Sequence, residues 1–309
     1  MLEKVIDSCK YVMNNSKYIT INYDKLDEFI TTIDCKDLKH WLSNNPYSML
    51  DLGIENVINF MLLYESIDYS FWGNPKWTIE TELGEKDGAD GLLYAMLRFV
   101  RKNSIDDLYN LSYEDFSEML KGNVEIPLIK ERYETLNENS KIVKEKMNGN
   151  FYKYIYSMHN DKELFQTIIN NFPSFKDERE YDGKTIYFYK LAQLLTSDIL
   201  HLRKQMEEIE VDYSHLVGCA DYKIPQTMRA LKLTEYNNEL ENIIDNKLEI
   251  DSSSKYEVEI RASMIVVIDY IKNKLDNTCA IDINDYFFTT SKKVKSIVRP
   301  YHLCRNQNY

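Results

Sequence analysis

The scarcity of helix-breaking residues constrains this chain more than any other feature. Its 309 residues include only 9 Gly and 6 Pro, and long stretches are rich in Leu, Ile, Lys and Glu. Most of these residues favour helix. Apolar residues make up 44% and charged residues 28%, a balance typical of globular rather than disordered chains. We therefore predict a mainly α-helical protein with minor β-structure.

Hydrophobic periodicity and turn signals predict the main elements. Apolar residues recur at helical spacing in 54–66, in 92–100 and in 256–275, where the last strongly apolar helix is expected, and a long helix is predicted over 189–210. Residues 103–150 resemble polar, helical connecting structure. A strand is predicted at 18–22, and a hairpin turn at Asp182-Gly183 leads into 185–188.

The organisation of the chain favours one unit. It shows no internal repeat and no low-complexity linker, and the stretch 250–255 is the best candidate loop, with serines that can cap the next helix. We predict a single domain over residues 1–309, with room for two lobes around a central cleft. The oligomeric state is left open.

Charge and cysteine usage exclude several classes of function. The net charge is −12, and an acidic chain without a Lys/Arg-rich run does not track a phosphate backbone. Long nucleic acid is therefore not expected as a ligand, whereas a single nucleotide is compatible with a few basic contacts. No apolar run reaches membrane-spanning length, and the first residues do not form a signal peptide. Scattered cysteines without paired spacing predict free thiols in the cytoplasm, with no metal and no cofactor.

The segment from Gly218 to Gln226 is the first candidate site. It places Asp221 beside Tyr222 and Lys223, between a glycine and Pro225, which fixes φ at the start of a predicted helix. A carboxylate at a helix N-terminus can stabilise positive charge on a substrate or orient a water. Hydrolysis of an N-glycosidic bond needs such stabilisation of positive charge, because the sugar becomes oxocarbenium-like as the base departs. The alternative is that Asp221 only caps the helix.

Two further candidates lie on helices. Lys190 begins a polar stripe with Gln193 and Ser197 and can reach an anionic group; the alternative is a solvated helix face. Glu259 faces small and apolar residues, so its carboxylate must be paired or functional. Its neighbours Glu257 and Arg261 form the spacing of a simple surface ion pair.

The aromatic and C-terminal candidates are more ambiguous. Phe71, Trp72 and Trp77 can form either a core cluster or a stacking platform for a base. His302 and Arg305 can converge on a phosphate or belong to a frayed tail. The other histidines show no metal-ligand spacing, and nucleophile motifs, phosphate-binding glycine loops and dinucleotide fingerprints are absent from the sequence.

These islands, in this order, resemble the signature of the queuosine salvage protein family, the queuosine 5′-phosphate N-glycosylases. The resemblance covers the chain from about residue 50 to the end, and each island is weak alone whereas the ordered set is specific. The matching stretches are Ser70–Trp77, Asp90–Ala95, Phe172–Asp177, Phe188–Gln193, Gly218–Gln226, Glu257–Ala262 and the tail with His302 and Arg305.

The resemblance implies a fold similar to helical DNA glycosylases and hydrolysis of queuosine 5′-monophosphate to queuine and ribose 5-phosphate, which supplies queuine for tRNA modification. It implies that Asp221 is the catalytic aspartate. Queuine is a 7-deazapurine, which lacks a nitrogen that hydrolases usually protonate, so the enzyme must stabilise the oxocarbenium ion and bind the base edge. The other implied contacts are Glu259 with the base edge, Trp72 or Tyr222 in stacking, and Lys190, His302 and Arg305 with phosphate.

Three positions depart from the family pattern. Cys219 stands among the substrate contacts where an aromatic residue is common, and Leu191 and Leu303 stand where Arg is common. Three other functions remain open from the sequence: a module that binds a queuosine-type nucleotide without turnover, a helical scaffold for protein partners, and a glycosylase acting on intact DNA or tRNA, which the negative charge disfavours.

Overall fold

Helices dominate the computed structural model, which describes residues 2–44, 49–293 and 299–309. The described residues form fourteen α-helices, a few 3₁₀ turns and three two-stranded antiparallel sheets. The prediction of a mainly α protein with minor β-structure is therefore confirmed. The closer similarity to helical DNA glycosylases remains a prediction.

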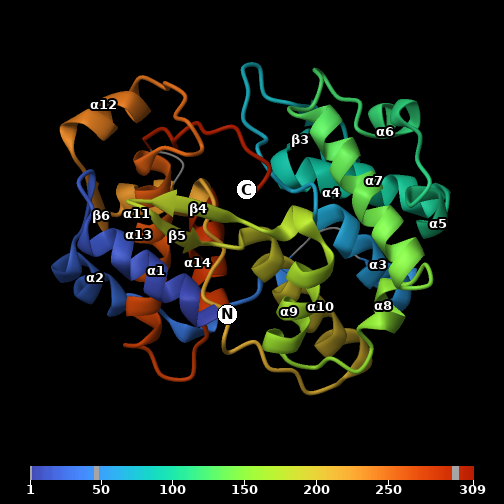
Figure 1. Cartoon of the computed structure of the whole chain (residues 1–309), viewed down its shortest axis with the longest axis horizontal. Helices are drawn as coiled ribbons and strands as arrows, with labels where there is room; N and C mark the ends of the chain where they lie inside the picture. Colours follow the sequence, from blue (N-terminus) through green and yellow to red (C-terminus); the bar gives the residue numbers. More distant parts are fainter. Residues whose placement is uncertain (1, 45–48, 294–298) are drawn as a thin grey trace.

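Figure 1 shows the helices in two groups. The first group combines the two ends of the described chain: α1 (Leu2–Asn14), α2 (Tyr23–Ile30), α11 (Lys223–Ala230), α12 (Asn238–Asp245), α13 (Lys255–Lys272) and α14 (Ala280–Lys293). The second group comes from the middle of the chain: α3 (Ile54–Glu65), α4 (Gly88–Lys102), α5 (Ile105–Leu108), α6 (Tyr113–Met119), α7 (Ile129–Lys146), α8 (Phe151–Tyr154), α9 (Asp161–Asn171) and α10 (Lys190–Glu207). The number of domains stays a prediction.

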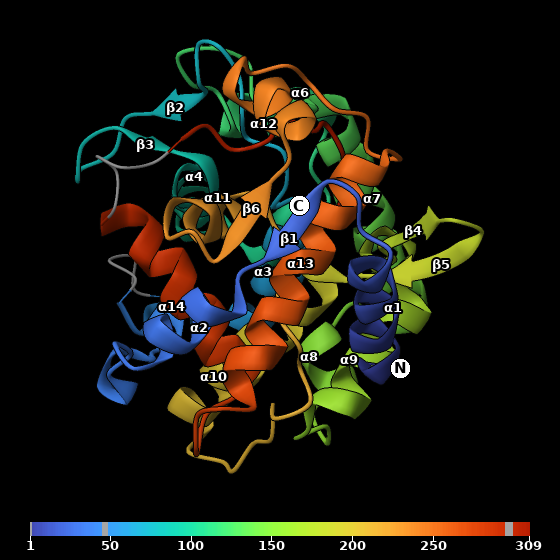
Figure 2. The ribbon, with the colours of Figure 1, turned by 90° about the vertical axis from the view of Figure 1, so that its left-hand side faces the viewer.

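The small sheets join segments that are distant in sequence. β1 (Ile19–Ile21) pairs with β6 (Thr234–Tyr236) in front of α13, as Figure 2 shows. β2 (Thr78–Ile79) pairs with β3 (Lys86–Asp87), and β4 (Glu178–Tyr181) forms a hairpin with β5 (Lys184–Tyr187). The predicted strand at 18–22 and the predicted hairpin are both confirmed.

The predicted helices are confirmed with small shifts at their ends. The helix expected over 189–210 is α10, and the helix expected over 256–275 is α13, which begins one residue earlier because the Ser254 hydroxyl accepts the Glu257 N–H. The 256–275 helix is not the last one, because α14 follows it. The polar stretch 103–150 is helical, as predicted, through α5, α6 and α7.

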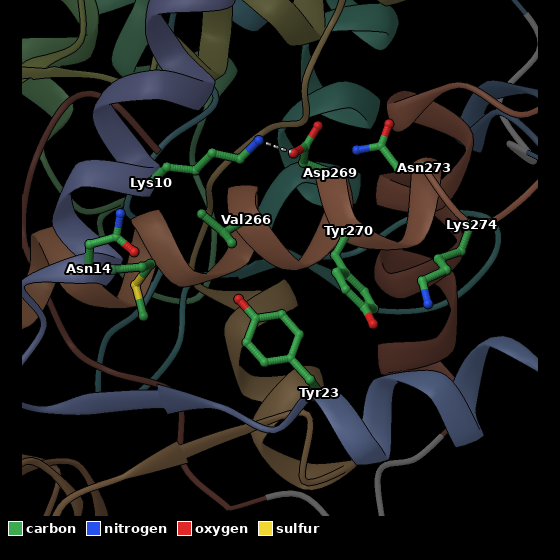
Figure 3. Close-up of a pocket in the computed structure, with 9 residues that line it drawn as sticks. Lys10, Asn14, Tyr23, Val266, Asp269, Tyr270, Asn273 and Lys274 are labelled. Atoms are coloured by element: carbon green, nitrogen blue, oxygen red, sulfur yellow. Dashed lines mark ion pairs between the residues drawn. The ribbon is translucent and has the colours of Figure 1, made fainter.

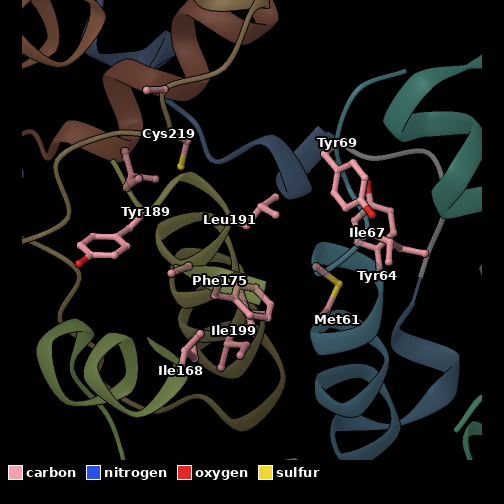
Figure 4. Close-up of a cluster of buried hydrophobic side chains, with 14 of the residues drawn as sticks. Met61, Tyr64, Ile67, Tyr69, Ile168, Phe175, Tyr189, Leu191, Ile199 and Cys219 are labelled. Atoms are coloured by element: carbon pink, nitrogen blue, oxygen red, sulfur yellow. The ribbon is translucent and has the colours of Figure 1, made fainter. Parts of the chain in front are cut away.

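One cluster of buried apolar side chains extends through both groups of helices. Figure 4 shows part of it, with Met61 on α3 and Leu191 and Ile199 on α10. Leu191, which departs from the family pattern, is 2% exposed, so an apolar side chain suits this position. Burying one such side chain contributes about 1.5–3 kcal/mol. No helix among the described residues is long and apolar enough to cross a membrane.

Candidate active site

A cavity of about 690 Å³ lies where the two groups of helices meet. Its walls come from the end of α3 and the residues after it, the starts of α4, α10 and α11, the segment before α11, α14 and the C-terminal segment. The lining combines three kinds of side chain: carboxylates, aromatic rings and lysines. The ionisable ones are Glu65, Asp68, Lys76, Asp87, Asp90, Lys190, Cys219, Asp221, Lys223 and Asp285, with Tyr64, Tyr69, Tyr222, Tyr301 and Tyr309.

Buried polar side chains fix the segment that carries Asp221. The Gln193 amide donates to the Gly218 carbonyl at 2.9 Å, and its oxygen accepts the N–H of Val217 at 2.8 Å. Asn284 Oδ1 accepts the Cys219 N–H at 2.9 Å. Gly218 has φ +119°, and a Cβ there would approach Ile268 to 3.0 Å, so this position requires glycine. The polar stripe on α10 is therefore a buried clamp and not a solvated face.

Arg261 completes this clamp from α13. Its Nε donates to the Ala220 carbonyl at 3.0 Å, and its guanidinium pairs with Asp177 and Glu257. The expectation of a surface Glu257–Arg261 pair is wrong, because both side chains are fully buried. The sequence near Arg261 does not show that this side chain is buried. Its carboxylate partner, Asp177, lies 84 positions away in the chain, so local spacing could not predict the pair.

Asp221 both caps a helix and lines the cavity. Its Oδ1 accepts the N–H groups of Lys223 at 3.0 Å and Ile224 at 2.8 Å, in the first turn of α11. Burial raises the pKa of Asp221, while the Ile224 N–H and the Lys190 ammonium partly oppose this rise. The two interpretations of the sequence are thus compatible, since the cap orients a carboxylate in the cavity wall.

Lys190 lies at the inner end of the cavity next to a carboxylate. Its Nζ is 3.1 Å from Asp68 Oδ2 and 3.3 Å from the Asp68 carbonyl. Burial by itself lowers the pKa of Lys190, but the carboxylates of Asp68, Glu65 and Asp221 raise it above the ordinary value. Lys190 is therefore a buried ammonium that already has one partner.

Two carboxyls that the sequence analysis did not single out also line the cavity. Asp285 on α14 accepts the Trp41 N–H at 2.9 Å, and burial raises its pKa to about 6. Glu65, at the end of α3, is fully buried. The sequence offered one indication of this burial, because Glu65 occupies an apolar position in the periodicity of the predicted 54–66 helix.

Aromatic rings make up a large part of the cavity wall. Tyr222 packs against Tyr301, with ring centroids 4.9 Å apart, and against Tyr309 at 6.3 Å. Lys223 Nζ lies 4.4 Å from the Tyr301 ring centroid, and Lys76 pairs with Asp87 at 3.1 Å. Cys219 also lines the cavity, and burial raises the pKa of its thiol well above the ordinary value.

Four of the predicted substrate contacts do not line this cavity. Trp72 donates through Nε1 to the Cys304 carbonyl at 3.0 Å, and the Arg305 guanidinium lies 3.9 Å from the Trp72 ring. His302 is buried beside the Tyr309 hydroxyl at 3.2 Å, and burial lowers its pKa to about 3. These three residues anchor the C-terminal segment, which is not frayed here.

The fourth residue, Glu259, is buried against the N-terminal segment. Its carboxylate accepts from the Ser16 hydroxyl at 2.6 Å, the Tyr18 N–H at 2.8 Å and the Tyr181 hydroxyl at 2.7 Å. The sequence argument was that this carboxylate must be either paired or functional, and the structure shows that it is paired. Its assigned contact with a base edge has no support in this geometry.

Two other features lie apart from the predicted site residues. A second cavity, of about 390 Å³, lies between α1, α2 and α13. The ion pair between Lys10 and Asp269 forms part of its lining (Figure 3). Among the described residues, Asp161, Asp212 and His215 form one group with the spacing of metal ligands. The buried Asp161 already accepts the N–H groups of His215 and Leu216, and the prediction of no metal remains a prediction.

The fold and the cavity define a mainly helical protein in which a carboxylate at a helix N-terminus lines a cavity. The sequence profile of the queuosine salvage protein family matches residues 49–309, and the chain belongs to this family. It is 26% identical to the queuosine 5′-phosphate N-glycosylase/hydrolase of Sphaerobacter thermophilus, over 99% of this chain and 97% of that one. It is 25% identical to the protein of the same name from Dictyostelium discoideum, over 97% of both chains, and 26% identical to that of Mus musculus, over 96% and 90%.

Proposed function

We propose that this protein hydrolyses the N-glycosidic bond of queuosine 5′-monophosphate and releases queuine and ribose 5-phosphate. The family and the names of the relatives support this activity. The observation that carries the proposal for this chain is the position of Asp221, whose carboxylate lines a nucleotide-sized cavity and is oriented by two backbone N–H groups.

Asp221 acts on the ribose. As the bond between the anomeric carbon and the base nitrogen lengthens, positive charge develops on the sugar, and a carboxylate close by stabilises it. The same carboxylate can take a proton from the attacking water. The buried clamp of Gln193, Asn284 and Arg261 keeps the Asp221 segment in place, so the charge is oriented before the reaction begins.

The remaining walls suit the other parts of the nucleotide. The Tyr222 ring offers a stacking face for the base, and Cys219 leaves space where a second ring would stand. Among the described residues, the lysines that line the cavity are Lys76, Lys190 and Lys223. We assign the phosphate to Lys76 and Lys223 in place of His302 and Arg305, and not to Lys190, which lies beside the carboxylates of Asp68 and Glu65. We further propose a cytoplasmic location, where the free thiols stay reduced and the released queuine serves tRNA modification.

The alternative is a module that binds the nucleotide without cleaving it. The capping role of Asp221 favours this alternative, since a cap needs no catalytic purpose. The experiment that separates the two is incubation of the purified protein with queuosine 5′-monophosphate, followed by chromatography of the base. Multiple turnovers with release of queuine establish the hydrolase, whereas saturable binding without release establishes the binding module.

A further inference from the structure

Glu65 is a buried carboxyl that receives no N–H or hydroxyl hydrogen bond from the part of the chain that the structure describes. It lines the cavity from the end of α3, its side chain is fully buried, and among the described residues neither of its oxygens accepts a hydrogen bond. Asp198 on α10 has one such oxygen, Oδ2, and is also fully buried. Leaving buried acceptors unpaired is costly, so this pair of carboxyls requires an explanation beyond packing.

The groups around Glu65 are mostly acidic. Asp198 approaches it closely enough for one hydrogen bond between the carboxyls, and such a bond exists only when one of them holds a proton. Lys190, a cation that acts on Glu65, is in contact with Asp68. The titratable groups that face Glu65 are Tyr64 on its own helix, Asp68 after that helix, Lys190 and Asp198 on α10, and Cys219 before α11.

The hydrogen-bond donors near this pair of carboxyls face Asp198 and not Glu65. Asp198 Oδ1 accepts the Trp41 Nε1–H at 2.9 Å and lies 3.3 Å from His40 Nε2. Glu65 has no comparable partner, and burial, followed by the charges of Asp198 and Asp68, raises its pKa well above the ordinary value. Glu65 is therefore the carboxyl of the cavity wall whose surroundings favour the neutral carboxylic acid.

We propose that Glu65 is the general acid of the reaction and gives its proton to the departing base. The inference rests on the proposed function. A 7-deazapurine lacks one ring nitrogen that a hydrolase would protonate, so a donor aimed at another nitrogen or at the oxygen of the base has more to contribute. Glu65 can supply this donor from the inner end of the cavity while Asp221 acts on the sugar.

The step balances in atoms and protons. The bond between the anomeric carbon and the base nitrogen breaks with both electrons going to the base, and the base takes the Glu65 proton. Water forms the new bond to the anomeric carbon and gives one proton to Asp221. Asp221 then gives that proton to solvent and Glu65 takes one from solvent through the cavity, so both carboxyls return to their starting states.

The test is Glu65→Gln assayed on two substrates. On queuosine 5′-monophosphate the variant should lose about 10²–10⁴-fold in kcat, the usual contribution of a general acid. On 4-nitrophenyl riboside 5-phosphate, whose leaving group needs no proton, it should keep a rate within about fivefold of wild type. Glu55→Gln, in the exposed first turn of the same helix, is the matched control and should behave as wild type on both.

Equal losses on both substrates would overturn the proposal, because they indicate a structural role. A rise in KM with kcat unchanged would overturn it as well.

Asp198→Asn supplies a second readout. Its amide can donate to Glu65 and stabilise the ionised form, so the alkaline limb of the kcat profile should move to lower pH; an unmoved limb contradicts the proposal. If wild type releases nitrophenol and no queuine, the proposed function fails; if it releases queuine and Glu65→Gln matches it, only Glu65 is wrongly assigned.

Discussion

At the scale of single residues, Asp221 combines a structural and a chemical role. Its Oδ1 accepts two N–H groups of the first turn of α11, and the helix dipole there favours negative charge. Burial opposes that charge and raises the pKa of Asp221. The cap therefore opposes the rise in pKa that burial causes, which favours the ionised form that stabilising an oxocarbenium ion requires.

This balance predicts the effect of Asp221→Asn on stability. A carboxyl whose pKa is higher in the folded than in the unfolded protein reduces the free energy of unfolding at every pH above both values. Asn cannot ionise, and it caps helices as well as Asp does. The variant should therefore unfold at an equal or higher temperature than wild type at pH 8, with the difference vanishing near pH 3. A clear loss of thermal stability at pH 8 alone would contradict this.

At the scale of elements, Arg132 on α7 organises the irregular segment that follows α3. Its guanidinium donates to the carbonyls of Ile67, Tyr69 and Ser70 and stacks on the rings of Tyr69 and Phe71. The same segment carries Asp68, Tyr69 and Phe71 into the cavity wall. A planar, five-donor group suits this task, and a lysine can satisfy only part of it.

We therefore predict that Arg132→Lys lowers the free energy of unfolding by about 1–3 kcal/mol, because buried carbonyls lose their donor. Its kcat/KM should fall as well, since the cavity wall loosens. Denaturant unfolding and steady-state kinetics measure the two effects. Arg101→Lys, at a surface pair with Asp51, is the control and should change stability by less than about 0.5 kcal/mol. Equal effects of the two substitutions would show that Arg132 does not organise the segment.

The sequence predicted the elements better than their contacts. Periodicity located α3, α10 and α13, because each has a buried face that repeats at helical spacing. Glu259 shows the limit: its buried carboxylate was recognised, but its partners Ser16 and Tyr18 lie more than 240 positions away. Glu65 was passed over because helix-face periodicity alone does not indicate that α10 brings Asp198 against it.

At the scale of the whole molecule, charge and enclosure both favour a small substrate. The net charge is −12, and the cavity lies between two groups of helices that the C-terminal segment connects. In that segment the Tyr309 carbonyl accepts the Ser70 N–H at 2.8 Å, and the Leu303 carbonyl accepts the Ile250 N–H at 2.8 Å. A tRNA backbone would face repulsion at the acidic surface, and Asp221 lies in the wall of a cavity of nucleotide size.

We accordingly predict release of queuine from the free nucleotide and not from intact tRNA. Queuosine-containing tRNA, before and after digestion to 5′-nucleotides, offers the same base in both forms. Only the digest should yield queuine, and intact tRNA added in excess should not inhibit turnover at about 0.15 M salt. Release from intact tRNA at a comparable rate would contradict the charge argument and favour a polynucleotide glycosylase.

The most direct test of the central claim compares wild type and Asp221→Asn for queuine release from queuosine 5′-monophosphate, with nucleotide binding measured on the same samples. The account predicts turnover by wild type and a loss of at least about 10²–10³-fold in kcat for the variant, with its affinity for the nucleotide retained. Turnover by Asp221→Asn at the wild-type rate would contradict the account, because the carboxylate would then serve only as a helix cap.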